Sequence, residues 1–152
     1  MSLNSFAPNT RIESAKVNAN FQNFSDHARN FTIKWSFVGT LAAYTTKDYI
    51  ALPDNATLNR VDLIVDTAPT GQAIIVDIER STDGGGSWTT IFTGGTNRPQ
   101  IAAAAKTGNT TTIDVPSATA NTHFYRAKIS QVGSGTAGAD LSVMVRGDYD
   151  LS

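Results

Sequence analysis

Hydrophobic and polar residues alternate along most of the chain beyond residue 30. In the run 61–66 and again in 74–79, an aliphatic residue recurs at every second position. This period of two is typical of a β-strand with one buried face. Apolar runs bounded by turn residues predict about eight strands, at 33–38, 48–52, 58–66, 72–80, 88–93, 111–115, 123–132 and 141–149.

The break between the third and fourth runs predicts a turn. Pro69 presets the backbone angle that the first half of a β-turn requires, and Gly71 relaxes the second half. We therefore expect 58–66 and 72–80 to pair as neighbouring antiparallel strands. The run 88–93 would then add the third strand of a meander.

The glycine-rich segment 133–138 has the spacing of a dinucleotide-binding fingerprint, G-x-G-x-x-G. That motif holds a pyrophosphate at the N-terminus of a helix. Here the glycines precede the alternating run 141–149, which predicts a strand, so the nucleotide interpretation is rejected. We expect instead a hairpin that pairs 123–132 with 141–149, with the apolar residues of each run on one face. The alanine-rich stretch 102–109 predicts a loop or one helical turn.

A different period appears before residue 30. Thr10 and Glu13 have the spacing of a capping box, which predicts a helix over 11–28. Its apolar residues fall on one side: Ile12, Val17, Phe21, Phe24 and Ala28. Such a stripe has to be covered, either by the sheet of its own domain or by a neighbouring subunit.

Together these patterns predict a mainly β fold, an antiparallel β-sandwich of jelly-roll-like form with about eight strands and one N-terminal α-helix. We divide the chain into an N-terminal arm and anchoring helix, 1–30, and a β-sandwich domain, 31–152. A chain of 152 residues is long enough for one domain that buries roughly 68 to 70% of its unfolded surface. Such a domain requires neither a metal nor a disulfide.

The charge balance does not point to a polyanionic partner. Twelve lysines and arginines nearly match 13 aspartates and glutamates, giving a net charge of -1. This composition predicts no attraction to nucleic acid or to an anionic membrane. The first residues lack the basic and apolar regions of a secretion signal, and no run approaches the roughly 20 apolar residues of a membrane helix. The absence of cysteine excludes a thiol nucleophile and a disulfide framework.

Charged residues recur on the predicted outer faces of the strands. The acids are Asp62, Asp66, Asp77 and Glu79, and the bases to which we assign the same parity are Arg60, Arg80, Arg126 and Lys128. Paired carboxylates on adjacent strands are found in glycoside hydrolases and calcium sites. We favour the simpler interpretation of a solvated face with cross-strand ion pairs.

A second motif predicts a particular turn. Its residues, Ser81, Asp83, Gly85 and Trp88, have the spacing of an Asp-box, the hairpin turn of sialidase-like propellers. The aspartate would accept hydrogen bonds from turn amides, the glycine would adopt positive φ, and the tryptophan would pack beneath the hairpin. Because propellers carry several copies and this chain has one, the motif predicts a turn and not a glycosidase.

The remaining candidates for chemistry predict no active site. The two histidines, His27 and His123, lack further ligands at metal spacing, and no acid–base pair is recognisable. Arg146-Gly147-Asp148 matches the integrin-binding tripeptide, but it ends a strand pattern, whereas recognition needs an exposed loop. We therefore expect no catalytic residue, no cofactor and no metal.

Two pieces of the chain resemble known proteins. The stretch 6–21 carries the pattern T-x-I-x-x-x-x-V-N-x-N-F and resembles the opening helix of many tailed-bacteriophage virion proteins. The stretches 68–71, 77–88 and 131–141 are similar to a β-domain that recurs in phage structural proteins. The resemblance covers about half of the chain and implies a virion component, located in the virion after assembly in the host cytoplasm.

This resemblance leads to a first expectation, a capsid decoration or cement subunit. Its partner would be the major capsid protein or a tail protein, and it would form a homo-oligomer, as a trimer. The predicted interface residues are Phe6, Ile12, Val17, Phe21 and Phe24. The alternatives are a tail-fibre or tail-adaptor subunit and a carbohydrate-binding module, whose candidate sugar-stacking residues are Trp35, Tyr44, Trp88 and Tyr125.

Overall fold

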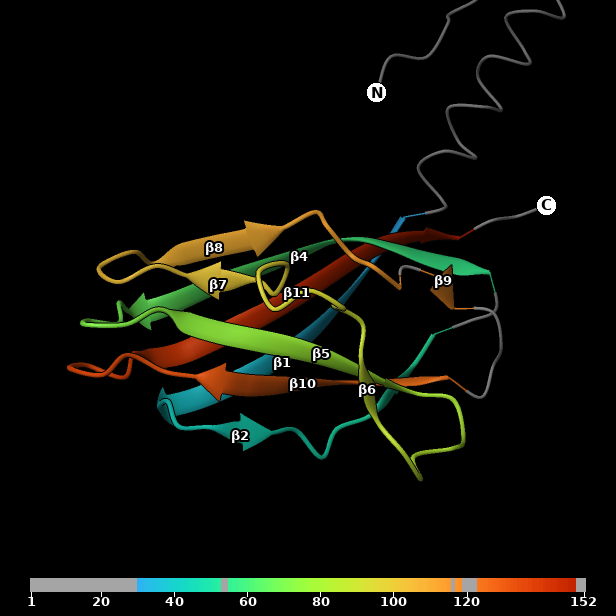
Figure 1. The fold of residues 1–152 in the computed structure, drawn as a ribbon, viewed down its shortest axis with the longest axis horizontal. Coiled ribbons are helices and arrows are strands. Elements are labelled where there is room, and N and C mark those ends of the chain that lie inside the picture. The colour runs from blue at the N-terminus through green and yellow to red at the C-terminus, as the bar shows by residue number, and fades with distance from the viewer. Residues whose placement is uncertain (1–29, 53–54, 116, 119–122, 150–152) are drawn as a thin grey trace, which may run out of the picture.

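The protein is described by a computed structural model over residues 30–52, 55–115, 117–118 and 123–149. This part of the chain is mainly β, with two antiparallel sheets and no helix (Figure 1). Within it there is accordingly no helix long and apolar enough to cross a bilayer. The helix predicted over 11–28 lies outside the described residues.

The described residues form eleven strands, five of which have eight residues or more: β1, β4, β5, β10 and β11 (Figure 1). Their bounds are β1 Asn30–Thr40, β2 Tyr44–Thr45, β3 Ile50–Ala51, β4 Ala56–Thr67, β5 Ile74–Ser81, β6 Thr89–Thr90, β7 Gln100–Ile101, β8 Thr107–Thr110, β9 Ser117–Ala118, β10 Phe124–Gln131 and β11 Ala139–Tyr149.

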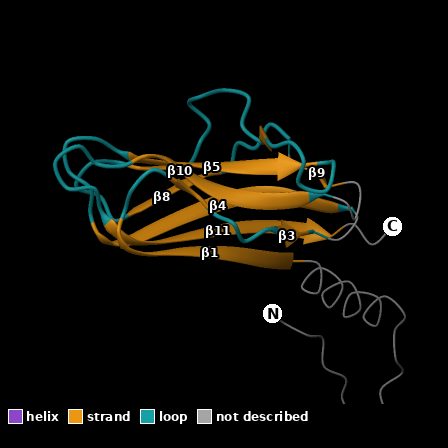
Figure 2. Cartoon of the chain, turned by 90° about the horizontal axis from the view of Figure 1, so that it is seen from below, coloured by secondary structure: helices purple, strands orange, loops and turns teal. Residues whose placement is uncertain are grey.

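The strands are divided between two sheets that lie one above the other (Figure 2). The first sheet has the order β1-β11-β4-β8, and β9 also pairs with β4. The second has the order β2-β10-β5-β6, with β3 paired to β10 and β7 paired to β5. Three strands are therefore interrupted, because β2 and β3, β6 and β7, and β8 and β9 each share one neighbour.

Most of the predicted strands are confirmed. Seven of the eight apolar runs overlap a strand, whereas the run 111–115 contains none and the strand of that region, β8, lies a few residues earlier. The loop or helical turn predicted over 102–109 is confirmed only in its first part, where 102–105 form a turn, with Ala104 at a φ of 66° and an Ala105 N–H bonded to the Ala102 carbonyl at 3.0 Å. The last part is wrong, because 107–109 belong to β8. The strands that the pattern missed include three of two residues, too short to show a period.

The predicted pairing of consecutive strands is wrong. β4 pairs with β11 and β8, and β5 pairs with β10, β6 and β7, so β4 and β5 lie in different sheets. β10 and β11 are separated in the same way. Both predicted hairpins are therefore connections between the sheets. Only the β5–β6 part of the expected meander is confirmed, with Glu79 opposite Thr90.

The two connections between the sheets are bonded to each other. Thr70 N–H donates to the Thr136 carbonyl at 3.0 Å, and Thr136 N–H donates to the Thr70 hydroxyl at 2.6 Å. Gly135 N–H donates to the Thr70 carbonyl at 3.0 Å. A Cβ on Gly71 would lie 2.3 Å from the Ser134 hydroxyl, so glycine allows this close approach. The turn residues thus reverse the chain, but from one layer to the other.

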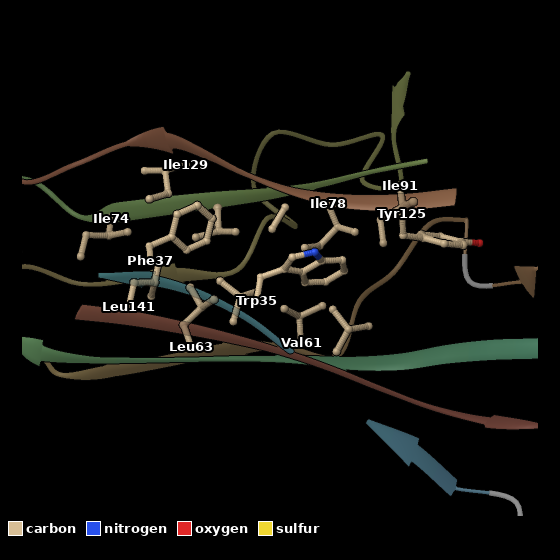
Figure 3. Packing of buried hydrophobic residues seen from close by; sticks show 14 of the residues in the cluster. Trp35, Phe37, Val61, Leu63, Ile74, Ile78, Ile91, Tyr125, Ile129 and Leu141 are labelled. Carbon is tan, nitrogen blue, oxygen red and sulfur yellow. The ribbon is translucent and has the colours of Figure 1, made fainter. Parts of the chain in front are cut away.

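The apolar faces of both sheets meet in one core (Figure 3). In that view Ile74, Ile78 and Ile129 point from the second sheet toward Val61 and Leu63 of the first. All five belong to the predicted buried positions, and all are at most 2% exposed. Burial of each such side chain contributes about 1.5 to 3 kcal/mol to folding. The prediction of which faces are buried is therefore confirmed for these strands.

The two long sides of the double layer differ. On one side β7 of the second sheet lies against β8 of the first, so close that a Cβ on Gly108 would lie 1.8 Å from the Gln100 carbonyl oxygen. On the other side β1 and β2 are the outer strands of their sheets. There the Trp35 indole N–H donates to the Asp48 carbonyl at 3.1 Å and links β1 to the segment between β2 and β3.

Candidate binding surface

The outer face of the second sheet carries most of the buried charge of the described residues. Period-two geometry puts Asp77 and Glu79 of β5 on this face, and the register places Lys128 and Arg126 of β10 directly opposite them. Asp77 is 4% and Glu79 8% exposed. The predicted cross-strand ion pairs are confirmed, but these two acids are buried and not solvated.

Glu79 is held by two basic side chains. Its Oε2 accepts a hydrogen bond from Arg126 Nε at 2.7 Å and lies 2.6 Å from Arg126 Nη2, while its Oε1 accepts one from Lys128 Nζ at 3.1 Å. Burial, the largest influence, favours the neutral acid, but the hydrogen bonds and charges of Arg126 and Lys128 outweigh it and lower the pKa of Glu79. Glu79 is therefore ionised at neutral pH.

Asp77 is bonded to β6 and to the segment between β6 and β7. Its Oδ2 accepts a hydrogen bond from Arg98 Nε at 2.9 Å, and its Oδ1 accepts one from the Thr90 hydroxyl at 2.5 Å. Arg98 was not among the basic residues expected here, because it lies in a loop without a strand period. The signal that could have found it is the buried acid itself, which requires a cationic partner.

Arg80 was expected on this outer face, and that expectation is wrong. Arg80 is paired with the fully buried Tyr125 on the neighbouring strand, and it lies two residues after Ile78, so all three residues are on the same face of the sheet. Burial raises the pKa of the Tyr125 phenol, although the Arg80 charge acts in the opposite direction. Arg80 therefore belongs to the inner face, at the end of the core.

The Asp-box turn is confirmed atom by atom. Asp83 Oδ1 accepts the Ser87 N–H at 2.8 Å, and its Oδ2 accepts the Ser87 hydroxyl at 2.7 Å. The Ser81 hydroxyl accepts the Gly85 N–H at 2.8 Å, and Gly84 and Gly85 have φ of 72° and 99°. The hydrogen bonds from Ser87 and Ser81 hold the pKa of Asp83 well below its usual range.

Trp88 follows this turn and lies on the charged face. Its indole N–H donates to the Gly85 carbonyl at 3.1 Å. The Arg126 guanidinium lies 4.1 Å from the centre of the indole ring, and the Tyr49 ring centre lies 4.9 Å from it. A cation over an aromatic face is attracted by the ring quadrupole. Trp88 therefore fixes the guanidinium that binds Glu79.

Beside this cluster the face is hollowed. The hollow has a volume of about 600 Å³ and is lined by Ala43, Tyr44, Thr45, Asp77, Arg98, Lys128, Ile129 and Ser130. A second hollow of about 400 Å³ opens between β1 and β2, and its lining includes Val38, which is 90% exposed. Tyr44 lines both hollows.

The outer face of the first sheet is more open. Asp62 Oδ1 accepts a hydrogen bond from Arg60 Nε at 2.6 Å, and its Oδ2 forms an ion pair with Arg146 Nε at 3.0 Å that lacks hydrogen-bond alignment. One row across the sheet, read from the register, carries no charge: Ser36, Ser142, Ile64 and Thr107. Ile64 is 44% exposed.

Several candidates from the sequence are placed by this geometry. Asp62 and Asp77 lie on different sheets, so the acids that we expected on adjacent strands do not converge. In the described part of the chain no three His, Cys, Asp or Glu side chains gather to hold a metal ion. His123 is buried directly before β10, and its Nδ1 has no partner among the described residues.

Two further candidates are decided by burial and pairing. Trp35 and Tyr125, two of the four aromatic residues considered for sugar stacking, are buried in the core, so that assignment is wrong for them. Arg146, Gly147 and Asp148 lie within β11, paired on both sides, as expected for a strand and not for an integrin-binding loop. The predicted interface residues, Phe6, Ile12, Val17, Phe21 and Phe24, lie outside the described residues and stay predictions.

Comparison with known proteins does not assign the chain to a family. No family model matches the sequence, and no curated protein matches it.

Proposed function

We propose that this chain is a virion structural protein of the capsid decoration type, which acts by binding neighbouring shell subunits and not by catalysis. The observation that carries the proposal is the strand order. If β2 with β3, β6 with β7, and β8 with β9 are each counted as one strand, the described residues form eight strands. Numbered along the chain, these strands lie side by side in the order 1-8-3-6 in one sheet and 2-7-4-5 in the other. This is the order of a jelly roll, and we infer that the two sheets form one.

The strand order needs a second argument, because one fold serves many functions. Jelly rolls occur in viral capsid proteins, lectins and cupins. The stretch 6–21, with its resemblance to the opening helix of tailed-phage virion proteins, favours the first of these classes. The proposal therefore rests on two features together: a strand order that capsid proteins also have, and the resemblance of 6–21 to virion proteins.

The outer face of the first sheet supports a role in assembly. The uncharged row that contains Ile64 crosses four strands and offers apolar and hydroxyl groups with a low desolvation cost. The hollow between β1 and β2 lies at the edge of the same sheet, beside the exposed Val38. In this proposal the first sheet contacts the shell, and the segment 1–30 anchors each subunit to a neighbour in a homotrimer.

The decisive experiment replaces the proposed anchor. The double variant Phe21→Ser/Phe24→Ser should lose binding to virus particles and should elute as a smaller species in size-exclusion chromatography with light scattering. Tyr49→Ser, which removes an exposed aromatic residue on the second sheet, is the matched control and should change neither property. Unchanged assembly and particle binding in the double variant would contradict the proposal.

The alternative within the same class is a tail-fibre or tail-adaptor subunit. Imaging of labelled protein on intact particles separates the two, because label over the shell supports decoration and label at the tail supports the alternative.

A further inference from the structure

β1 is an outer strand of the first sheet, and its outer edge is open in the described part of the chain. Its 11 residues pair only with β11, and no backbone group of β1 bonds to any other strand described. About half of the N–H and C=O groups of an outer strand point away from its one partner. β1 has no proline, and Lys34 is its single charged residue, so little on this edge opposes the addition of another strand.

The hollow between β1 and β2 lies beside this edge. Phe37, Leu41 and Ile129 line it and are 9%, 5% and 2% exposed. Thr46, a buried polar residue of the lining, has its hydroxyl bonded to the backbone of Ala127, to which it donates at 3.1 Å and from which it accepts at 3.1 Å. The most buried part of the lining therefore offers apolar surface.

Aromatic and aliphatic groups also stand at the mouth of the hollow. Tyr44 is 51% exposed, and its ring meets Phe37 edge to face, with ring centres 6.1 Å apart and planes at 86°. Val38, another lining residue, is 90% exposed. A third ring that entered here could pack on both aromatic residues. The volume of about 400 Å³ lies near the lower end of the range of ligand sites and suits one bulky side chain.

The open edge and the hollow together select an extended peptide as the occupant. Phe37 and Val38 belong to both features, since they are residues of β1 that also line the hollow. When a peptide adds to a sheet edge, its main chain bonds to the edge and a neighbouring pocket takes one of its side chains. A lipid or another apolar small molecule would fill the hollow but leave the edge without partners.

The sequence before β1 contains a stretch with this chemistry, residues 2–9, which we call the arm. The arm has no charged side chain, so it loses little hydration when it is covered, and Phe6 is its single aromatic residue. Eight extended residues span about 26 Å. The edge of β1 from Asn30 to Val38 has about the same length.

We propose that the arm of a neighbouring copy adds as a strand to the open edge of β1, and that Phe6 of that copy fills the hollow between β1 and β2. The arm comes from a neighbour, because the predicted helix 11–28 separates it from β1 by about 27 Å. A subunit's own arm would reach its hollow only if this helix folded back along β1, over the edge that the arm has to occupy. This docking site depends on the proposed anchoring role of 1–30, and it is the surface of the neighbour that receives the anchor.

Because the chain has no cysteine, engineered disulfides test the contact directly. Phe6→Cys and Val38→Cys chains with different tags are co-expressed, and the purified assembly is oxidised. We expect a disulfide between one chain of each kind on a non-reducing gel, since such a bond forms only where two Cα atoms come within about 7 Å. Asn109→Cys, which is exposed on β8 across the same sheet, is the matched control and should give no link to Phe6→Cys.

A second measurement uses no cross-link. Phe6→Ser should weaken the association of subunits by about tenfold or more, because it removes the side chain that fills the hollow. Val38→Lys should weaken association in the same direction without unfolding the domain, because Val38 is 90% exposed. Dilution series in the analytical ultracentrifuge give both values, and Tyr49→Ser should associate as the wild type does.

Three results would overturn the docking site. The first is no link between Phe6→Cys and Val38→Cys chains. The second is an equally strong link of Val38→Cys to itself, which would indicate that two β1 edges pair with each other. The third is a link confined to single chains of the double variant Phe6→Cys/Val38→Cys, which would indicate a subunit's own arm.

Failure of the decoration role is read from a different measurement, the particle binding of Phe21→Ser/Phe24→Ser. If that variant loses particle binding and the cross-link is absent, only the docking site is refuted. If the cross-link forms and that variant still binds particles, only the anchoring role in decoration is refuted.

Discussion

Each sheet carries an acid between two basic side chains on its outer face, and the two groups differ in burial. In the first sheet Asp62 lies between Arg60 and Arg146, whose side chains are 42% and 53% exposed. In the second sheet Glu79 lies between Lys128, whose side chain is 42% exposed, and Arg126, whose side chain is only 20% exposed. The two carboxylates are similarly buried, at 14% for Asp62 and 11% for Glu79, so the difference in burial lies in the arginines. The same pattern of charges therefore occurs in two different environments.

The cause of the difference is what lies over each face. On the second sheet Trp88 covers the Arg126 guanidinium, and the segment between β6 and β7 supplies Arg98 to Asp77. On the first sheet, among the described residues, no aromatic ring stacks on Arg60 or Arg146, and no arginine from a loop binds Asp62. Solvent screens exposed ion pairs, whereas covered ones are stronger and more costly to break. We infer that the second group stabilises the fold and that the first leaves a face open for a partner.

The largest difference should appear when each acid is removed. Glu79→Ala removes the carboxylate that binds Lys128 and Arg126, of which Arg126 is covered by Trp88, and we expect a loss of about 2 kcal/mol in the free energy of unfolding. Asp62→Ala should cost less than about 1 kcal/mol, because its partners are solvated. Urea denaturation of both variants measures the two values. Equal losses would refute the comparison.

The covering residue is tested by a second pair of variants. Trp88→Ala uncovers Arg126 and removes an aromatic contact with Tyr49, so we expect a loss of about 1 to 2 kcal/mol. Ile64→Ala on the first sheet removes an exposed side chain and should change stability by less than about 0.5 kcal/mol. Thermal unfolding followed by circular dichroism provides the measurement. A larger effect of Ile64→Ala would show that the first face is covered.

Acid should distinguish the wild type from Glu79→Gln. Because the pKa of Glu79 is lowered on folding, its ionisation stabilises the protein above the ordinary glutamate pKa, about 4.3, and this contribution is lost as the pH falls through the lowered value. The stability difference between wild type and variant should be constant from pH 7 to 6 and should shrink below about pH 4.3. The carboxyl groups of Asp83 and Asp114, whose pKa values are also lowered, are present in both proteins. A difference that stays constant down to acid pH would contradict this assignment.

The smallest expected effect is that of salt on the first sheet. The Asp62 ion pairs are partly exposed, so raising the salt concentration should reduce their contribution by at most about 0.5 kcal/mol. Comparison of Asp62→Asn with the wild type at low and high sodium chloride isolates this contribution. A salt effect larger than that of Glu79→Gln would reverse the order of the two faces.

Local patterns in the sequence predicted much of the fold because they need no knowledge of partners. The period of two identified the buried residues of β4, β5, β10 and β11, and the spacing from Ser81 to Trp88 predicted the turn between β5 and β6. The candidate surface was found only in part. Its acids and two of its bases were named, but Arg98 reaches it from a loop, where no period marks which way a side chain points.

The sequence by itself determined which side of each strand faces the core, since alternation is a property of a single strand. Only the tertiary structure decided which sheet each strand joins. Proline and glycine at 69–71 and glycines at 133–138 reverse the chain equally well within a sheet or between sheets. In the folded chain the two connections are joined by hydrogen bonds between Thr70 and Thr136, which are 66 residues apart in the sequence. No local pattern contains a contact of that kind, because it exists only when both connections are already folded.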